Sequence, residues 1–265
     1  FEVGMDRKGE ITKLSKLIRP NLGIITNISY AHIKNFQNLK DIANAKSELI
    51  EQIEKGGTIV LNKDDNFFNF LKKKSKNKSL KILTFSKSKQ SDIRLGRIKT
   101  NNSISQLKII INGNHPVDFK IPNKLLPYLD NILGVLAIVS VYFSPNEIKN
   151  NIFQDFDITD GRGNLIVIKK NNKRIKIIDE SYNSNPLSLK FSINNFEKIK
   201  SKNSRKIVLL GDMLELGKYS KKLHLEASKY INNSNIDKVF VFGNYIKYTF
   251  NKIKPQKRGK ILNKY

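Results

Sequence analysis

Short apolar runs alternate with amphipathic stretches along the first third of the chain. The runs are rich in Ile, Leu and Val, which is typical of buried strands, and the stretches repeat apolar side chains at the three- and four-residue spacing of helices. The expected strands are residues 22–28, 58–61 and 81–85, and the expected helices are 38–54, closed by Gly56 and Gly57, and 64–73, capped by Asp64 or Asn62. This alternation predicts a parallel sheet with helices on its faces.

The middle of the chain predicts an edge hairpin and two helices before a polar boundary. The expected elements are a hairpin of 93–100 with 105–111 and helices over 129–143 and 145–153. The polar stretch 155–163 follows and contains the sequence Gly-Arg-Gly. We interpret this stretch as the boundary between two domains, 1–157 and 158–265.

The remainder of the chain repeats the alternation of strand and helix. The expected strands are 165–170, 174–178, 206–210 and 238–242, and the expected helices are 186–199 and 220–231, followed by a helix and a basic tail. The first two strands make a hairpin around Asn171 and Asn172. The expected fold class is therefore α/β, with a second, Rossmann-like unit.

A net charge of +26 invites a nucleic-acid interpretation, because clustered Lys and Arg bind phosphate backbones. Here Lys is spread over the whole length, and we interpret the densest run, Lys72 to Lys78, as a solvated helix end and loop. The chain has no Cys, which excludes disulfides and fits a reducing, cytoplasmic setting. The longest apolar run is too short to cross a bilayer.

Two motifs stand where a strand is expected to give way to a helix. Residues 179–186 read Asp-Glu-Ser-Tyr-Asn-Ser-Asn-Pro, and residues 209–217 read Leu-Leu-Gly-Asp-Met-Leu-Glu-Leu-Gly. In this order and spacing they resemble the C-terminal domain of the Mur ligase family. The resemblance covers nearly the whole chain and is strongest at 1–65 and 158–225.

The resemblance implies a fragment: a partial central, ATPase-like domain over 1–157 and a partial Rossmann-like C-terminal domain over 158–265. The chain opens on an apolar, strand-like Phe-Glu-Val, and Gly4 and Gly9 lack the Lys and Ser/Thr that must follow in a phosphate-binding loop. We expect that loop and the UDP-binding domain to lie upstream. The fragment alone is expected to be inactive.

The resemblance implies an ATP-dependent ligase of peptidoglycan precursor synthesis, with ATP and Mg²⁺ as cofactors. The expected substrates are UDP-N-acetylmuramoyl-tripeptide, which becomes an acyl phosphate, and D-alanyl-D-alanine, whose amine displaces the phosphate. The expected enzyme is a monomer that neither binds nucleic acid nor enters a membrane. The alternatives are a superfamily ligase of folylpolyglutamate or cyanophycin type and a basic nucleic-acid-binding module.

Lys46 lies in the apolar stripe of the expected helix 38–54. A lysine there either extends to solvent or is paired, because an isolated buried ammonium is costly. Residues 45–49, Ala-Lys-Ser-Glu-Leu, resemble the family segment whose lysine is carbamylated, which would turn Lys46 into a Mg²⁺ ligand. The resemblance implies Glu2 and His32 as the other metal ligands, and counts Lys46 and His32 as catalytic.

The resemblance also implies a nucleotide site. Asn131 resembles the first asparagine of the family's adenine-binding helix, although Gly134 stands where a second asparagine is usual. Arg162 resembles the interdomain arginine that meets the nucleotide phosphates, and it counts as both catalytic and cofactor-binding. Asp179 and Glu180 are implied at the ATP ribose.

A substrate site is implied by the rest of the first motif. The resemblance directs Tyr182, Asn183 and Asn185 toward the zwitterionic dipeptide, while ordinary turn chemistry explains the same residue types. Asp212 and Glu215 mark a second turn of this kind, for which a purely structural role is equally open.

Overall fold

The structure is a computed structural model, and it describes residues 1–101, 103–171, 173–199 and 204–263. The chain folds as two compact units. Unit 1 comprises Phe1–Ile28 and Asn38–Asp157, and unit 2 comprises Ser29–Gln37 and Ile158–Tyr265. Residues 29–37, called the 29–37 segment below, therefore pack as part of unit 2, although both of their neighbours in the sequence belong to unit 1.

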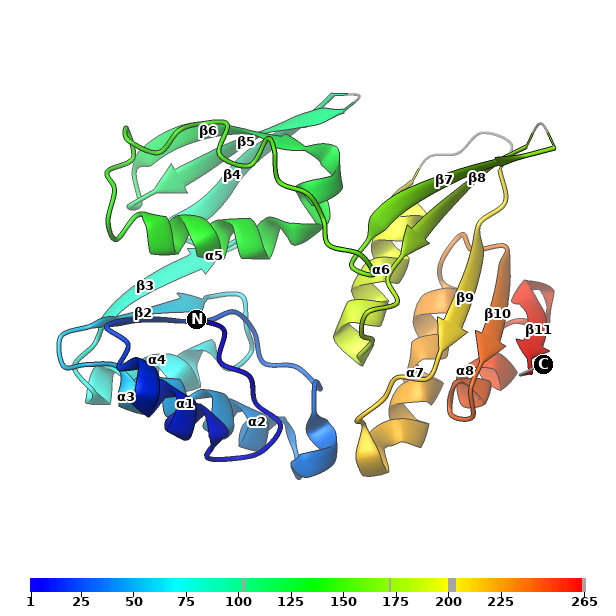
Figure 1. The fold of residues 1–265 in the computed structure, drawn as a ribbon, viewed down its shortest axis with the longest axis horizontal. Helices are drawn as coiled ribbons and strands as arrows, with labels where there is room; N and C mark the ends of the chain where they lie inside the picture. The colour runs from blue at the N-terminus through cyan, green and yellow to red at the C-terminus, as the bar shows by residue number, and fades with distance from the viewer. Residues whose placement is uncertain (102, 172, 200–203, 264–265) are drawn as a thin grey trace. The chain divides into compact units, whose positions relative to one another are not determined.

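Unit 1 is built on a six-stranded sheet in the order β1-β2-β3-β4-β5-β6 (Figure 1). The strands are β1 (Leu22–Ile25), β2 (Thr58–Asn62), β3 (Lys81–Ser86), β4 (Ile93–Thr100), β5 (Ile104–Ile111) and β6 (His115–Pro122). The helices are α1 (Glu10–Ile18), α2 (Leu39–Lys46), α3 (Glu48–Gln52), α4 (Phe68–Asn77), η2 (Asn123–Tyr128) and α5 (Leu129–Val139). Strands β1 to β4 pair in parallel, and β5 and β6 continue the sheet in antiparallel pairing.

Helices cover both faces of the parallel strands. Helix α5 contacts β1, β2 and β3 on one face, and α4 contacts β2 and β3 on the other (Figure 1). Strands covered on both faces become continuous apolar runs in the sequence. Ile59, Val60 and Leu61 of β2 are fully buried, and the strands expected near 22–28, 58–61 and 81–85 are confirmed.

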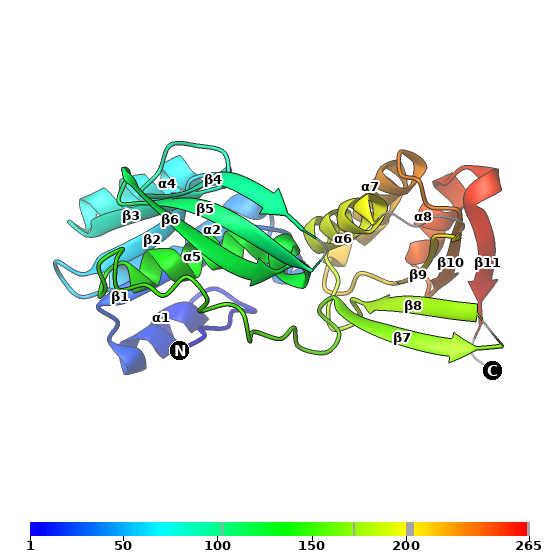
Figure 2. The ribbon, with the colours of Figure 1, turned by 90° about the horizontal axis from the view of Figure 1, so that it is seen from above.

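The expected edge hairpin is confirmed as β4 and β5, and β6 extends it by a strand that the sequence pattern did not predict (Figure 2). Pro116 and Pro122 lie within β6 and disfavour an interior strand. They are tolerated because β6 is the last strand in the sheet order, where one side of its backbone has no ladder to complete.

The expected helix 38–54 is wrong in one respect, because it is two helices separated at Ser47. The Ser47 hydroxyl donates a hydrogen bond to the backbone oxygen of Asn44 at 2.7 Å. Local bonds of this kind compete with the helical backbone pattern, so α2 ends at Lys46 and α3 begins at Glu48.

The expected helix 64–73 begins later than predicted, at Phe68. Asn62 and Asp65 each accept a hydrogen bond from the backbone N–H two residues ahead, at 2.9 and 2.7 Å. These two turns consume the residues that were expected to start the helix.

Two further expectations for unit 1 are wrong. Residues 145–153 form turns rather than a helix, and Glu147 accepts hydrogen bonds from both the backbone N–H and the hydroxyl of Ser144 at 2.7 Å, which fixes a turn. Residues 1–5 are not a strand, because no described strand pairs with them. Helix α1 was not predicted at all.

The described residues of unit 2 form two sheets. Strands β7 (Asn164–Lys170) and β8 (Lys173–Asp179) form the expected hairpin, and β9 (Ile207–Gly211), β10 (Lys238–Phe242) and β11 (Arg258–Leu262) form a parallel sheet in the order β11-β10-β9. The helices are α6 (Pro186–Lys198), α7 (Ser220–Asn232), α8 (Ile246–Lys252), η1 (Ile33–Asn35), η3 (Gly217–Tyr219) and η4 (Pro255–Lys257). The expected basic tail instead contains β11, which pairs with β10.

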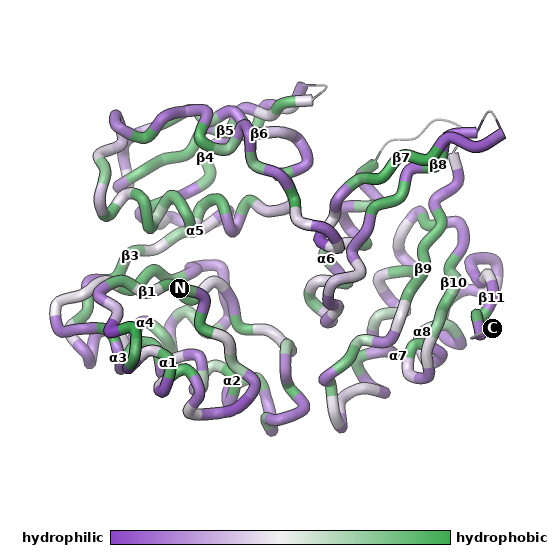
Figure 3. Tube along the Cα trace, in the orientation of Figure 1, coloured by the Kyte–Doolittle hydropathy of each residue, from purple (hydrophilic) through white to green (hydrophobic). Residues whose placement is uncertain are grey.

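Hydropathy along the trace follows these elements (Figure 3). Apolar residues run along β9 and β10, and Val239 and Val241 of β10 are fully buried. Among the helices in the described part of the chain, none is long and apolar enough to cross a membrane.

Candidate active site

Lys46 lies at the end of α2, beside the loops that follow β1 and β2. Its Nζ donates a hydrogen bond to the backbone oxygen of Asn27 at 2.8 Å. Burial lowers the pKa of Lys46, and the negative charge of Asp65 opposes that shift. The structure thus places an amine that loses its proton more readily than usual at the carboxyl ends of parallel strands.

Asp65 is itself fixed, and sequence reasoning did not identify it. Its two carboxylate oxygens accept hydrogen bonds from the backbone N–H groups of Ile28 and Phe67, each at 2.7 Å. Asp65 therefore joins the loop after β1 to the loop after β2. The available signal was an aspartate just past a buried strand, where polar groups of an α/β sheet gather.

Asp64 ties the loop after β2 to the loop after β3. It accepts hydrogen bonds from the hydroxyls of Ser86 and Ser88 at 2.9 and 2.7 Å and from the Lys87 backbone N–H at 2.7 Å. Burial acts to raise the pKa of Asp64, but these hydrogen bonds outweigh it and the pKa is lowered. Asp64 is therefore an anion that organises the rim of the sheet.

A shallow hollow of about 380 Å³ opens beside these loops. It is lined by Lys63, Asp65, Asn66, Phe68, Asn69 and Lys89. Lys63 and Lys89 give it a basic rim, although Lys46 does not line it.

Asn131 is exposed on α5, next to Asp130, which pairs with Lys87 at 2.6 Å. Gly134 is buried against the sheet: a Cβ there would lie 3.0 Å from Ile24 Cδ1. A larger side chain at 134 would have to displace Ile24. Position 134 therefore serves close packing of α5 on β1.

Glu2 and Glu48 occupy different places around α1. Glu2 is exposed in the irregular segment before the helix. Glu48 is the first residue of α3, and its carboxylate accepts hydrogen bonds at the start of α1 from the backbone N–H groups of Gly9 and Thr12, at 2.8 and 3.1 Å. A carboxylate at this end satisfies unpaired helix donors and the helix dipole.

In unit 2, the structure brings Arg162 and Tyr182 together. The guanidinium carbon of Arg162 lies 4.3 Å from the centre of the Tyr182 ring. The backbone N–H of Tyr182 donates to the Gly161 oxygen at 3.0 Å, and that of Gly163 donates to the Asp179 oxygen at 2.6 Å. The Gly-Arg-Gly boundary and the 179–186 motif are therefore a single structure.

Gly161 makes this contact possible. Its φ is +72°, and a Cβ at this position would lie 2.9 Å from the Tyr182 backbone nitrogen. A left-handed conformation and close backbone approach are both cheap only for glycine.

The acidic pair after β8 contains one structural and one unusual carboxyl group. Asp179 accepts a hydrogen bond from the Ser181 backbone N–H at 3.0 Å. Burial of its carboxyl raises the pKa of Glu180, the negative charge of Asp179 adds to this, and a hydrogen bond with Ser192 opposes it. Glu180 therefore retains a proton to a higher pH than an ordinary glutamate.

Asn183 is exposed, whereas Asn185 caps α6. The Asn185 side-chain oxygen accepts hydrogen bonds from the backbone N–H groups of Leu187 and Ser188, both at 3.0 Å. The Ser188 hydroxyl in turn accepts from the Asn185 backbone N–H, which completes a capping box.

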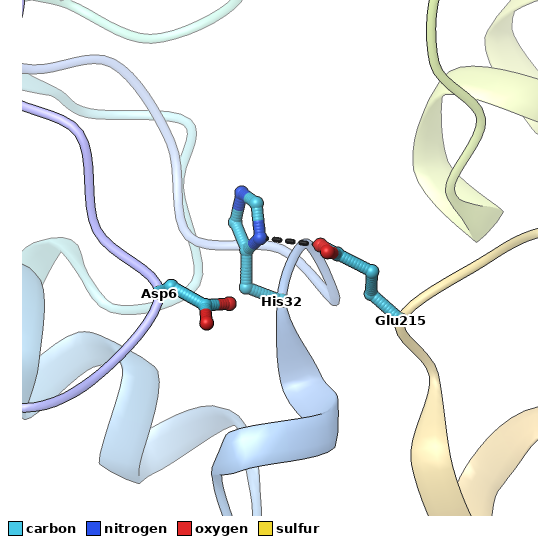
Figure 4. Close-up of side chains that lie close together, drawn as sticks. All are labelled: Asp6, His32 and Glu215. Carbon is cyan, nitrogen blue, oxygen red and sulfur yellow. Dashed lines mark ion pairs between the residues drawn. The ribbon is translucent and has the colours of Figure 1, made fainter.

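The loop after β9, residues 212–219, packs against the 29–37 segment within unit 2. Glu215 contacts two side chains of that segment. Its Oε2 lies 2.5 Å from His32 Nδ1 (Figure 4). Its Oε1 lies 2.9 Å from the Lys34 ammonium nitrogen Nζ. The Lys34 hydrogen bond, together with the charges of His32 and Lys34, outweighs burial and lowers the pKa of Glu215. Sequence reasoning singled out His32 and the turn at 215 but did not connect them.

The 212–219 loop is anchored from behind by two buried arrangements. His224 is fully buried, with Nε2 accepting from the Met213 backbone N–H at 3.0 Å and Nδ1 2.7 Å from the Ser220 oxygen. Asp212 accepts from the backbone N–H groups of Asn244 and Ile246 at 2.9 and 2.7 Å. The base of the loop is therefore fixed to α7 and to the start of α8.

The two units place the chain among α/β proteins that gather charged groups at the carboxyl ends of parallel strands. Residues 1–139 match the Mur ligase middle domain, and residues 161–259 match the Mur ligase, glutamate ligase domain. The chain therefore belongs to the Mur ligase family. This confirms the family that the motifs at 179–186 and 209–217 indicated, and the α/β fold class with it.

Individual members of the family share sequence and fold with nearly the whole chain. The UDP-N-acetylmuramoyl-tripeptide–D-alanyl-D-alanine ligase of Rickettsia prowazekii is 33% identical over 261 residues, which cover 98% of this chain and 56% of the relative. A structure of MurF from Acinetobacter baumannii has a TM-score of 0.83 at 22% identity, covering 97% of this chain and 54% of that one.

A structure of MurF from Thermotoga maritima in complex with ADP has a TM-score of 0.72 at 20% identity, covering 98% of this chain and 62% of that one. At these identities the two structures show a shared fold. The chain spans a little over half the length of the Rickettsia relative.

Proposed function

We propose that this chain forms the central and C-terminal parts of an ATP-dependent ligase that joins D-alanyl-D-alanine to UDP-N-acetylmuramoyl-tripeptide. The observation that carries the proposal is the 33% identity to the Rickettsia ligase of that name across 98% of the chain. In the proposed reaction, a tripeptide carboxylate oxygen attacks the γ-phosphorus and ADP leaves. The dipeptide amine then attacks the acyl carbon and phosphate leaves. We place this chemistry in a cytoplasmic, monomeric enzyme.

Lys46 is the proposed metal-binding residue of unit 1. Its lowered pKa favours the neutral amine, which is the form that adds carbon dioxide and becomes a carbamate. The carbamate, the Asp65 carboxylate and the Asn27 backbone oxygen are hard oxygen donors, so this neighbourhood fits Mg²⁺ chemically. We assign Glu2 and His32 as further ligands by family resemblance. Bound Mg²⁺ would neutralise charge on the transferring phosphoryl group.

Arg162 is the proposed phosphate-binding residue of unit 2. A guanidinium stacked on an aromatic ring presents its N–H groups in one plane, which suits phosphate oxygens. Asp179 or Glu180 is proposed for the ATP ribose, whose hydroxyls can donate to a carboxylate. Asn131 is proposed at the adenine.

Tyr182, Asn183 and Asn185 are the proposed dipeptide contacts. The side-chain oxygen of Asn185 already caps α6, so its contribution to a substrate would come from the amide NH₂. Asn183 is exposed and offers both its oxygen and its amide.

The test is product formation by the natural polypeptide that carries this sequence. With ATP, UDP-N-acetylmuramoyl-tripeptide and D-alanyl-D-alanine, we expect phosphate release that requires both substrates and a product heavier than the acceptor by one condensed dipeptide. Glutamate with a folate acceptor is the matched control. Turnover with that pair, and none with the dipeptide, would favour the folylpolyglutamate-type alternative.

A further inference from the structure

Glu215 and His32 face each other from two strained turns. Both are non-glycine residues with positive φ, +61° for Glu215 and +59° for His32. Such conformations cost free energy and persist only where surrounding contacts impose them, often at functional sites. In Figure 4 the Glu215 carboxylate meets Nδ1 of the imidazole, and the second ring nitrogen points away from it.

The contact has backbone as well as side-chain components. The Lys34 backbone N–H donates to the Glu215 backbone oxygen at 2.9 Å, and Lys34 Nζ lies 2.9 Å from Glu215 Oε1. These two bonds fix the backbone and one carboxylate oxygen of Glu215. The other oxygen is thereby placed at the imidazole of His32.

Other residues add contacts between the 212–219 loop and the 29–37 segment. The Tyr219 hydroxyl donates to the Gln37 backbone oxygen, and the rings of Tyr219 and Tyr30 lie 6.5 Å apart. Gly217 has a φ of +52°, and a Cβ there would lie 3.0 Å from Lys34 Cα. The 212–219 loop therefore fits the 29–37 segment closely along its length.

We propose that Glu215 is a positioning residue for His32. The Glu215 carboxylate keeps a proton on Nδ1 of His32 and directs Nε2 of the same ring away, as the ligand-binding nitrogen. This inference rests on the proposed function, in which His32 ligates Mg²⁺. Carboxylates that contact the second nitrogen of a metal-binding histidine fix both its tautomer and its ring orientation.

Stability alone does not explain this arrangement. The His32, Lys34 and Glu215 side chains are each between 37 and 38% exposed, and ion pairs with that much solvent contribute little to stability. Two backbones with positive φ cost more free energy than such exposed contacts return. Orientation of the His32 imidazole explains these contacts better than a gain in stability does.

The experiment uses the imidazoles themselves as reporters. The 265-residue chain has three histidines, and ring ¹⁵N correlation spectra at pH of about 8.5, well above the ordinary histidine pKa of about 6.5, report which nitrogen carries the proton. His32 should show the Nδ1–H form. His224 is buried and reports that unit 2 is folded, and the exposed His115 is the solvent reference.

Three variants separate geometry from charge. Glu215→Gln removes the anion, and Glu215→Asp keeps the charge but withdraws it by one methylene from His32. We expect the Nδ1–H form of His32 to be lost in both. Glu226→Gln, on α7, removes the same charge elsewhere in unit 2 and should leave His32 unchanged. In the natural polypeptide, kcat/KM should fall about 10- to 100-fold in both Glu215 variants.

Every outcome bears on the proposal. An unchanged His32 signature in Glu215→Gln would overturn it, as would loss of the His224 signals in both Glu215 variants, because Glu215 would then serve folding. A wild-type signature in Glu215→Asp would replace positioning with a simple charge effect. If the natural polypeptide lacks ligase activity but the ring signature responds, the proposed function fails while the orientation of His32 by Glu215 stands.

Discussion

The guanidinium carbon of Arg162 lies 4.3 Å from the centre of the Tyr182 ring, so the arginine proposed for phosphate contacts a tyrosine proposed for the dipeptide. Replacing Tyr182 by Leu should remove the ring contact of the guanidinium and lower kcat/KM for ATP about 2- to 5-fold, the equivalent of ~0.5–1 kcal/mol for an exposed cation–π contact. Steady-state kinetics of the natural polypeptide measure this. Tyr182→Phe keeps the ring and should stay near wild type. Equal losses in both variants would show that the hydroxyl matters, and not the stacking.

Lys46 offers a test of the carbamate. Lys46→Ala should abolish ligase activity, and added short-chain carboxylates should restore part of it by supplying the missing anion. Lys46→Arg should remain inactive, because a guanidinium stays cationic and cannot be carbamylated. Phosphate release is the readout. Near-normal turnover by the arginine variant would mean that Lys46 is only a half-buried helix residue bonded to Asn27.

Asn185 has a capping role that can be separated from a substrate role. Asn185→Ala should lower the free energy of unfolding by about 0.5–2 kcal/mol, because two helix N–H groups lose their acceptor. Asn185→Asp keeps the acceptor and should unfold like wild type in urea. If the amide NH₂ contacts the dipeptide, the aspartate variant should still raise the KM for D-alanyl-D-alanine. An unchanged KM would restrict Asn185 to its capping role.

His224 should make unit 2 sensitive to acid. Burial lowers its pKa, so the neutral imidazole is favoured in the folded state. Its contribution is complete above the ordinary histidine pKa of about 6.5 and is lost as pH falls through the lower folded-state value. Urea unfolding of the chain between pH 7.5 and 5 should therefore show falling stability.

His224→Leu is the matched variant for that profile. Its free energy of unfolding at pH 7.5 should be about 1–3 kcal/mol lower than that of wild type, because the Met213 N–H and the Ser220 oxygen are left without their partner. Its remaining stability should vary less between pH 7.5 and 5. A profile as steep as that of wild type would point to other groups.

The parallel strands could be predicted because burial on both faces leaves a continuous apolar run, as at Ile59, Val60 and Leu61. Helix α1 could not, because its first N–H groups are satisfied by Glu48, a residue that lies far along the chain. Strand β11 is defined by pairing with β10, which its basic composition does not indicate.

The candidate site residues likewise divide into those that the sequence indicated and those that only the fold reveals. Lys46 was recognisable as a polar residue in an apolar stripe, and Arg162 by its flanking glycines. The contacts that orient these residues were not recognisable. The charge of Asp65, which the fold brings near Lys46, opposes the lowering of the Lys46 pKa. Tyr182 contacts Arg162 from the next loop, and Glu215 contacts His32 from a turn that is distant in the sequence. Local patterns predict candidate side chains, whereas tertiary contacts decide how each one is oriented.

The 29–37 segment makes this chain difficult to divide into interchangeable modules. A cut near residue 157 would separate the 212–219 loop from the residues that it contacts, since those residues are encoded between β1 and α2. A C-terminal domain grafted from another family member would have to match Lys34 and His32 with its own acid. Recombination between such ligases should therefore succeed only when these two distant stretches of sequence are inherited together.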